Sequence, residues 1–217
     1  MSTDDMRLRE GVVATARSLN TLGINRGKAG NVSARCGDGL LITPSGVPYD
    51  RTEPDDVVHL AIDGRVLQGR YAPSTEWHFH CAIYGARPDV GAVVHTHGPF
   101  STALACLDRG IPAFHYMVAK AGGDDIRCAG YATFGTVELA RRAVAALEGR
   151  RACLLSHHGM IAVGRDLEAA LGLAIDTEAL AEAYLRALQI GEPALLDAAE
   201  MARVAERFAG YGPKPGR

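Results

Sequence analysis

The chain has 217 residues, of which 47% are hydrophobic and 22% charged, a composition typical of a globular protein with a substantial core. Its formal net charge of −2 excludes the strongly basic surface that attracts nucleic acid or an acidic membrane. No apolar run is long enough to span a bilayer, and the polar N-terminal segment does not resemble a secretory signal. We therefore expect a single domain over residues 1–217 that has neither nucleic acid nor a membrane as a partner.

The hydrophobic pattern changes along the chain between the helical period and short β-branched runs. In the first half it predicts, in order, a helix at 6–22, strands at 32–36, 40–43, 57–62 and 65–67, a helix at 76–87 and a strand at 90–94. In the second half it predicts a helix at 100–107, an extended segment at 111–116, a helix at 136–147, strands at 152–155 and 160–163, and helices at 166–189 and 193–208. The glycine- and proline-rich tail at 210–217 should lie on the surface. This order predicts a layered α/β fold in which helices cover one sheet.

The number and spacing of the cysteines indicate the cellular compartment in which the protein is found. The five cysteines are odd in number and scattered, with no Cys-x-x-Cys pair. This distribution argues against a disulfide framework or a structural zinc knuckle and favours reduced thiols. We expect a cytoplasmic protein.

Two histidines stand where a buried strand is predicted to end. His95 and His97 follow a β-branched run, and side chains two apart on a strand point to the same face. Both imidazoles would then face one point, and imidazole suits zinc and its first-row neighbours. Two more candidates are His158, which follows the apolar run 152–155, and Glu76, at the start of a predicted helix. The four side chains form a candidate catalytic zinc site, a type that typically keeps one coordination position open.

Three loops rich in glycine and hydroxyl side chains are candidates for binding an anion. They are 27–31 (Gly-Lys-Ala-Gly-Asn), 43–46 (Thr-Pro-Ser-Gly) and 73–75 (Pro-Ser-Thr). Backbone N–H groups, hydroxyls and a helix N-terminus are the groups that hold phosphate, and Lys28 is one of only three lysines in the chain. Each loop alone is typical of an ordinary turn. The third, however, leads directly into Glu76, so an anion bound there would lie beside the metal.

Motifs spread over almost the whole chain resemble those of the class II aldolase/adducin-head family, and within it the L-fuculose-1-phosphate aldolases. The matching stretches are Gly30-Asn31-Val32-Ser33, 41–46 (Leu-Ile-Thr-Pro-Ser-Gly), Ser74-Thr75-Glu76-Trp77, Val94-His95-Thr96-His97, 111–117 (Ile-Pro-Ala-Phe-His-Tyr-Met), 131–136 (Tyr-Ala-Thr-Phe-Gly-Thr) and His157-His158-Gly159. The resemblance implies a three-layer α/β domain with a central mixed or antiparallel sheet flanked by helices. It also implies a homotetramer with one Zn²⁺ per subunit and active sites at the subunit interfaces.

The resemblance further implies roles for individual residues. His95, His97 and His158 would hold the metal, and Glu76 would be both a fourth ligand and the catalytic acid/base. The phosphate of the substrate would be bound by Asn31, Ser45, Gly46, Ser74 and Thr75, to which the composition of the first loop adds Lys28 and Gly30. Tyr116 and Tyr211 would act on the aldehyde end of a substrate in a neighbouring site.

The reaction implied is cleavage of a ketose 1-phosphate, of the L-fuculose 1-phosphate type, into dihydroxyacetone phosphate and a small aldehyde. Breaking a carbon–carbon bond next to a carbonyl leaves an enediolate, and a zinc ion would neutralise its charge as a Lewis acid. Bound phosphate would hold the three-carbon half in place. Glu76 would move the proton at the enediolate carbon, and Tyr116 the proton on the leaving aldehyde oxygen.

Several alternatives stay open. Lys28 stands where the similar aldolases have threonine, and the family also contains epimerases, dehydratases and decarboxylases on the same metal scaffold. A Schiff-base aldolase would use Lys120 or Lys28 as the nucleophile, which would leave the histidines without a role. An adducin-like binding module would be expected to have lost the metal ligands. Of the other histidines, His157 should point to the opposite side of its strand, and His78, His80 and His115 should be core or surface residues.

Overall fold

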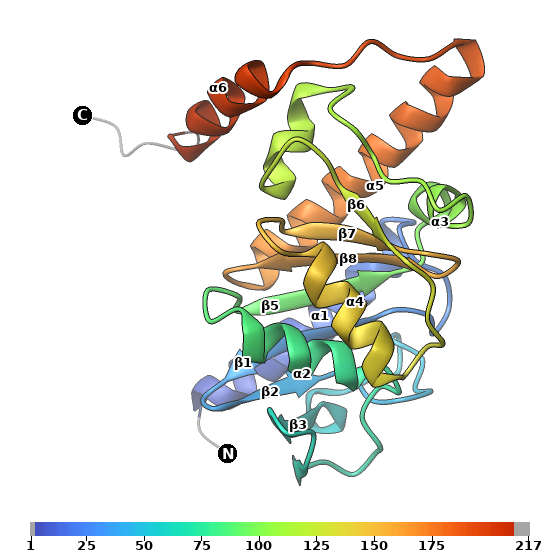
Figure 1. The fold of residues 1–217 in the computed structure, drawn as a ribbon. Coiled ribbons are helices and arrows are strands. Elements are labelled where there is room, and N and C mark those ends of the chain that lie inside the picture. The colour runs from blue at the N-terminus through green and yellow to red at the C-terminus, as the bar shows by residue number, and fades with distance from the viewer. Residues whose placement is uncertain (1–2, 211–217) are drawn as a thin grey trace.

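The computed structural model describes residues 3–210, and one eight-stranded sheet organises them (Figure 1). The strands lie in the order β4-β3-β2-β1-β5-β8-β7-β6. Their bounds are β1 (Asn31–Cys36), β2 (Gly39–Ile42), β3 (Val58–Ala61), β4 (Val66–Gln68), β5 (Ala92–Thr96), β6 (Arg127–Ala129), β7 (Ala152–Leu155) and β8 (Gly159–Gly164). Neighbouring strands in this sheet pair antiparallel except β6 and β7, which are parallel. The predicted mixed sheet is confirmed.

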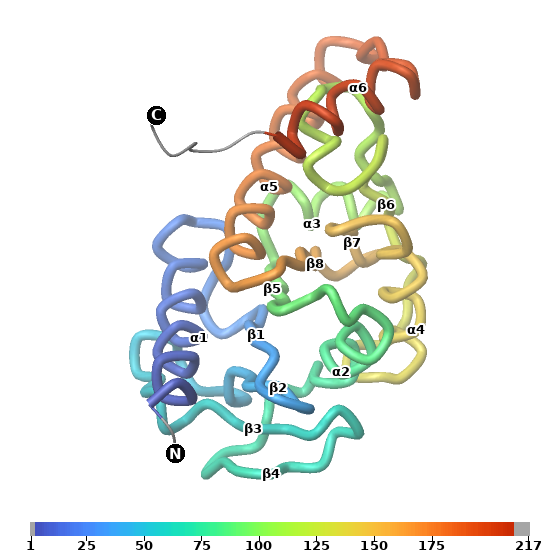
Figure 2. Tube along the Cα trace, turned by 90° about the vertical axis from the view of Figure 1, so that its left-hand side faces the viewer, coloured from blue at the N-terminus to red at the C-terminus, as the bar shows by residue number. Residues whose placement is uncertain are grey.

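Helices cover both faces of the sheet and make three layers (Figure 2). One face packs against α1 (Thr3–Thr21), α3 (Pro99–Ala105) and α5 (Leu167–Ile190), and the other against α2 (Trp77–Ala86) and α4 (Val137–Ala146). The last helix, α6 (Ala198–Ala209), packs on the short 3₁₀ helix η2 (Tyr116–Ala121), and a second 3₁₀ turn, η1 (Pro54–Asp56), precedes β3. Within residues 3–210 there is no helix with both the length and the apolarity needed to cross a membrane.

The alternation of side chains along β5 separates the two hydrophobic cores. Ala92 and Val94 belong to the core under α1 and α5, whereas Val93 belongs to the core under α2 and α4. His95 lies two residues beyond Val93 and therefore points to the α2 face of the sheet. The antiparallel register with β1 pairs Asn31 with His95 and Ser33 with Val93, so these polar side chains share that face. The register thus brings a polar patch to the start of α2.

Side-chain caps explain where the later helices begin. Thr136 accepts a hydrogen bond from the backbone N–H of Leu139 at the start of α4, and Asp166 accepts one from Ala169 at the start of α5. Such caps satisfy N–H groups that lack a partner within the helix. The predicted helix starts at 136 and 166 are therefore confirmed to within one residue. Glu76, predicted as the first residue of a helix, is instead the residue just before α2.

The segment between α3 and α4 differs from the sequence prediction. Only Ile111 in the predicted extended stretch 111–116 pairs with another strand residue, exchanging both backbone hydrogen bonds with Ile126 at 2.8 Å. The chain then turns into η2, where the ring of His115 accepts a hydrogen bond from the N–H of Met117 at 3.2 Å. The edge strand β6 was not predicted, because its three residues, Arg-Cys-Ala, carry no alternating apolar pattern. The tail at 210–217 lies outside the described residues except for Gly210.

Candidate metal centre and active-site pocket

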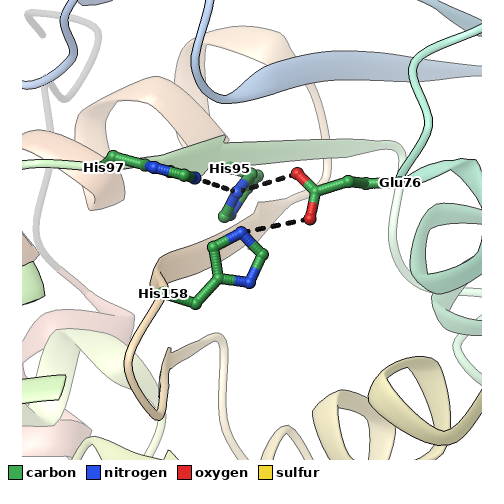
Figure 3. A group of neighbouring side chains, drawn as sticks. All are labelled: Glu76, His95, His97 and His158. Carbon is green, nitrogen blue, oxygen red and sulfur yellow. Dashed lines mark hydrogen bonds and ion pairs between the residues drawn. The ribbon is translucent and has the colours of Figure 1, made fainter. Parts of the chain in front are cut away.

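Four side chains from three separate parts of the chain meet where the central strand β5 ends and its neighbour β8 begins (Figure 3). His95 is on β5 and His97 just after it, His158 is in the turn between β7 and β8, and Glu76 precedes α2. Their ligand atoms all lie within 4.8 Å of one another. The Nε2 of His95 is 2.9 Å from the Nε2 of His97 and 3.1 Å from the Oε2 of Glu76, and the Nε2 of His158 is 3.1 Å from the Oε1 of Glu76. The structure therefore brings together the predicted metal-binding set.

The hydrogen bonds around this cluster point lone pairs toward its centre. The Nδ1 of His95 lies 2.8 Å from the carbonyl oxygen of Met160, which can only accept, so Nδ1 carries the proton and Nε2 carries a lone pair. That lone pair faces the Glu76 carboxylate. Although buried, the Oε1 of Glu76 makes no hydrogen bond to any group in residues 3–210. Lone pairs that face one another without a proton between them raise the free energy of the folded state unless a cation lies among them. The nitrogen and oxygen atoms of this cluster therefore suit a metal ion.

Electrostatics within the cluster support the same conclusion. Burial alone would raise the pKa of Glu76, but positive charge on the imidazoles of His95 and His158 outweighs burial and holds the pKa below its usual range, so the carboxylate is stabilised by the kind of charge that a bound cation supplies. Burial, together with the neighbouring imidazoles, lowers the pKa of His97 to about 3, so its ring is neutral at pH 7. A carboxylate beside imidazole nitrogens is a ligand set that zinc prefers.

The cluster forms one wall of a cavity of about 320 Å³. The lining includes Glu76, His97 and His158, whereas His95 is fully buried behind them. The lining also includes every residue that was predicted to bind phosphate: Lys28, Gly30, Asn31, Ser45, Gly46, Ser74 and Thr75. The three loops therefore meet beside the metal cluster, as a joint anion site requires.

Backbone contacts hold the three loops together. The N–H of Ser45 donates to the carbonyl of Ala72 at 2.9 Å, and the N–H of Ser74 donates to the carbonyl of Thr43 at 3.0 Å. At Gly30 the backbone φ is +73°, and a Cβ there would lie 2.5 Å from the carbonyl oxygen of His95. Only glycine fits this left-handed position so close to the metal-binding strand. The first loop is thus packed directly on β5.

Tyr49 and His157 are pocket residues that sequence reasoning missed. The Tyr49 hydroxyl donates a hydrogen bond to the carbonyl of Gly30 at 2.7 Å and so helps to fix the first loop in place. His157 was expected to point away from His158, but it adopts a left-handed turn conformation, with φ at 54°, and lines the same cavity. Two residues alternate sides on a strand but not in such a turn, which is why the expectation was wrong.

Of the two predicted tyrosines, the structure describes Tyr116, which does not line the cavity of its own chain. Tyr116 begins η2, is 49% exposed and stacks on Phe208 of α6 with ring centroids 6.1 Å apart. It borders a different hollow, next to Met117 and Lys120. Tyr211 lies outside the residues that the structure describes.

Comparisons with known proteins agree with this geometry. The family described as Class II Aldolase and Adducin N-terminal domain matches residues 10–185, most of the chain. The chain belongs to this family. As a class II aldolase it is a lyase, and the resemblance seen in its motifs is confirmed.

The relatives of this class II aldolase include enzymes with named substrates. It is 61% identical to a 5-methylthioribulose-1-phosphate/5-deoxyribulose-1-phosphate aldolase from Rhodospirillum rubrum, over 94% of this chain and 92% of the relative. It is 47% identical to an L-fuculose phosphate aldolase from Escherichia coli, over 95% of this chain and 96% of the relative. Among solved structures, an L-fuculose 1-phosphate aldolase superposes with a TM-score of 0.92 at 38% identity, covering 96% of this chain and 98% of the other. The class II aldolase fold is therefore shown by sequence and structure alike.

Proposed function

We propose that the enzyme is a zinc-dependent aldolase that cleaves a ketose 1-phosphate into dihydroxyacetone phosphate and a small aldehyde. The observation that carries the proposal is the meeting of three anion-type loops with the Glu76, His95, His97 and His158 cluster in one cavity. The relative at 61% identity makes 5-methylthioribulose 1-phosphate and 5-deoxyribulose 1-phosphate the first substrates to test. L-Fuculose 1-phosphate, the substrate expected from the motifs, is the second.

Different residues would bind the phosphate, hold the metal and transfer the proton. Hydroxyls and backbone N–H groups of the three loops, with Lys28, hold the phosphate and so fix the position of the sugar carbonyl. When bound, one divalent metal ion per subunit, which we infer to be zinc, supplies a Lewis acid that stabilises negative charge. The Glu76 carboxylate lies between the loops and the imidazoles, where it can take a proton from the substrate and return it.

Part of the cavity lining suits an apolar end of the substrate. Tyr131, Ala132 and Phe134 form it, and the rings of Tyr131 and Phe134 are exposed to solvent in this chain alone. Apolar surface of this kind binds a methyl or methylthio terminus better than a further hydroxyl. This lining supports 5-deoxy and 5-methylthio sugars as substrates and gives the aldehyde half its place.

Loss of the phosphate should cost the enzyme both substrate affinity and rate. Charge-assisted hydrogen bonds contribute about 1.5–3 kcal/mol each, so a ketose without phosphate loses several of them at once. Because binding energy at a remote group positions the reacting carbons, kcat should fall as well as KM rise. The experiment compares kcat and KM for each of the three sugars with and without its phosphate, by measuring the rate at which the aldehyde or dihydroxyacetone phosphate is released. Inorganic phosphate should compete with the substrate.

Lys28→Thr gives this experiment a matched variant, because it restores the threonine of the similar aldolases. We expect it to keep or raise activity on L-fuculose 1-phosphate. Equal cleavage of a free sugar and its phosphate ester would show that the loops are ordinary turns. A phosphorylated sugar that is converted without release of an aldehyde would instead favour an epimerase, dehydratase or decarboxylase of the same family.

We also propose a homotetramer in which Tyr116, together with Tyr211, serves the site of a neighbouring subunit. Support comes from the exposed position of Tyr116 outside its own metal cavity and from exposed apolar side chains in the C-terminal part of the chain, such as Ile190 and Leu195. A phenol there would donate a proton to the aldehyde oxygen as it leaves.

The free cysteines of the described chain support the proposed location in the cytoplasm.

Subunit complementation tests the shared site. Tyr116→Phe and His97→Ala should each be nearly inactive alone. When the two variants are co-expressed, a Tyr116→Phe subunit keeps its metal ligands and receives an intact tyrosine from a His97→Ala neighbour, so activity should return. Sedimentation velocity should show an oligomer throughout. A monomer, or a mixture no more active than its parts, would contradict the proposal.

A further inference from the structure

A line of buried hydrogen bonds runs from Glu76 into the interior between β1 and α2. Asn31 Nδ2 lies 3.0 Å from Glu76 Oε2, and His80 Nε2 lies 2.5 Å from Asn31 Oδ1. On the other side of the imidazole, Ser33 Oγ lies 2.6 Å from His80 Nδ1 and 2.9 Å from the Tyr84 hydroxyl. None of these five residues is more than 6% exposed. Glu76 and Asn31 line the cavity, whereas the rest of the line, from His80 to Tyr84, is shielded from water.

Each donor and acceptor in the line is determined by its neighbour. The Glu76 carboxylate can only accept, so the amide nitrogen of Asn31 faces it and the amide oxygen faces His80. That oxygen also only accepts, so His80 must carry a proton on Nε2. Burial lowers the pKa of His80 to about 3, which keeps the ring neutral and leaves Nδ1 as an acceptor for the Ser33 hydroxyl. The Ser33 oxygen then accepts from Tyr84, and all the bonds run in one direction.

We propose that His80 is a positioning residue, held as the Nε2–H tautomer, which orients the Asn31 amide so that Glu76 faces an N–H group. The opposite tautomer would present a lone pair to Asn31 and attract its NH₂ group. The amide would then turn its carbonyl toward the Glu76 carboxylate, placing two acceptors against each other. The tautomer of a residue that touches neither substrate nor metal thus sets the surroundings of the catalytic carboxylate.

This arrangement distinguishes the two oxygens of Glu76. Oε2 receives the hydrogen bond from Asn31 and lies 3.1 Å from the Nε2 of His95, whereas Oε1 faces the Nε2 of His158 at 3.1 Å. The Asn31 bond stops the carboxylate from rotating and so keeps Oε1 turned toward the imidazole of His158. The expected effect on turnover rests on the proposed role of Glu76 as proton carrier, but the tautomer itself does not.

Nitrogen NMR of the purified protein labelled with [¹⁵N]histidine reads the tautomer directly. The His80 ring, identified by the signals that are missing in His80→Gln, should be neutral with its proton on Nε2 at pH 7, with and without zinc. A His80 ring protonated on Nδ1, or on both nitrogens, would overturn the proposal. This readout needs no substrate. A wild type that cleaves no ketose 1-phosphate would refute the proposed function and leave the tautomer result standing.

Three variants separate positioning from general damage to the core. His80→Phe keeps an aromatic ring but removes both hydrogen bonds, and we expect kcat to fall about 10–100-fold with KM and zinc content little changed. His80→Gln should recover part of the loss, because its NH₂ group can take the place of Nε2–H. Tyr84→Phe removes a buried hydroxyl from the same line but leaves Ser33 able to donate, so kcat should stay close to wild type.

Two kinetic outcomes would count against His80. The first is wild-type kcat in folded His80→Phe, and the second is an equal loss in Tyr84→Phe. Should His80→Phe fail to fold, the comparison of His80→Gln with Tyr84→Phe and the wild-type NMR spectrum still decide the question.

Discussion

Glu76→Gln should lower kcat by about 10²–10⁴-fold, the usual contribution of a general acid or base, while most of the metal stays bound. The carboxylate lies on the wall of the cavity beside the phosphate loops, and the neutral amide cannot take a proton from carbon. His95, His97 and His158 still offer three imidazoles, the usual number of protein ligands in a catalytic zinc site. Steady-state kinetics and elemental analysis of the same preparation measure both effects.

Glu178→Gln is a matched control, because Glu178 is a second buried carboxylate. It accepts hydrogen bonds from the N–H groups of Phe100 and Ser101 at the start of α3, at 2.6 and 3.1 Å, and does not line the metal cavity. We expect turnover near the wild-type value. Wild-type turnover in Glu76→Gln would reduce Glu76 to a structural residue. Loss of metal in that variant would show that the carboxylate is an essential ligand.

Removal of the metal should abolish activity. Dialysis against a chelator is expected to leave an inactive protein that zinc or cobalt reactivates, because a metal of this kind supplies the Lewis acid for the reaction. His97→Ala should fail to retain the metal, since it takes away one of three imidazoles. His59→Ala removes a histidine of β3, away from the cavity, and should keep both metal and activity.

A lysine-based enzyme would behave differently in this experiment. It would keep full activity without metal and would be trapped by borohydride in the presence of substrate. The structure already disfavours Lys120 as that nucleophile, since its Nζ pairs with Asp176 at 2.8 Å and lies outside the metal cavity. Lys28 does line the cavity, so Lys28→Thr tests the remaining candidate.

The candidate metal cluster could be predicted because the position of each of its residues depends on the local sequence pattern. The two-residue spacing of His95 and His97 fixes a common face once β5 is recognised, and His158 and Glu76 each stand at the boundary of a strongly patterned element. The sheet itself followed from the alternation of apolar runs. These features depend on residues close in sequence, which is where pattern reasoning works best.

The supporting residues were out of reach because they depend on contacts between distant segments. His80 is bonded to Asn31, 49 positions away, and nothing in the local pattern distinguishes it from a core histidine. One signal was available: His80 lies four residues after Glu76, so both could face the same side of a helix. Tyr49 and His157 depend on loop conformations, which sequence periodicity does not describe.

The register between β1 and β5 makes folding and catalytic competence inseparable. Asn31 pairs with His95 and Ser33 with Val93. Sliding one strand by a single residue would send Asn31 and Ser33 to the α1 face and move Val32 and Ala34, which belong to the opposite core, against the imidazoles. Such a slipped molecule would lose both of its hydrophobic cores together with its active site. A preparation saturated with metal should therefore hold fully competent and unfolded molecules, and partial activity should reflect their proportion.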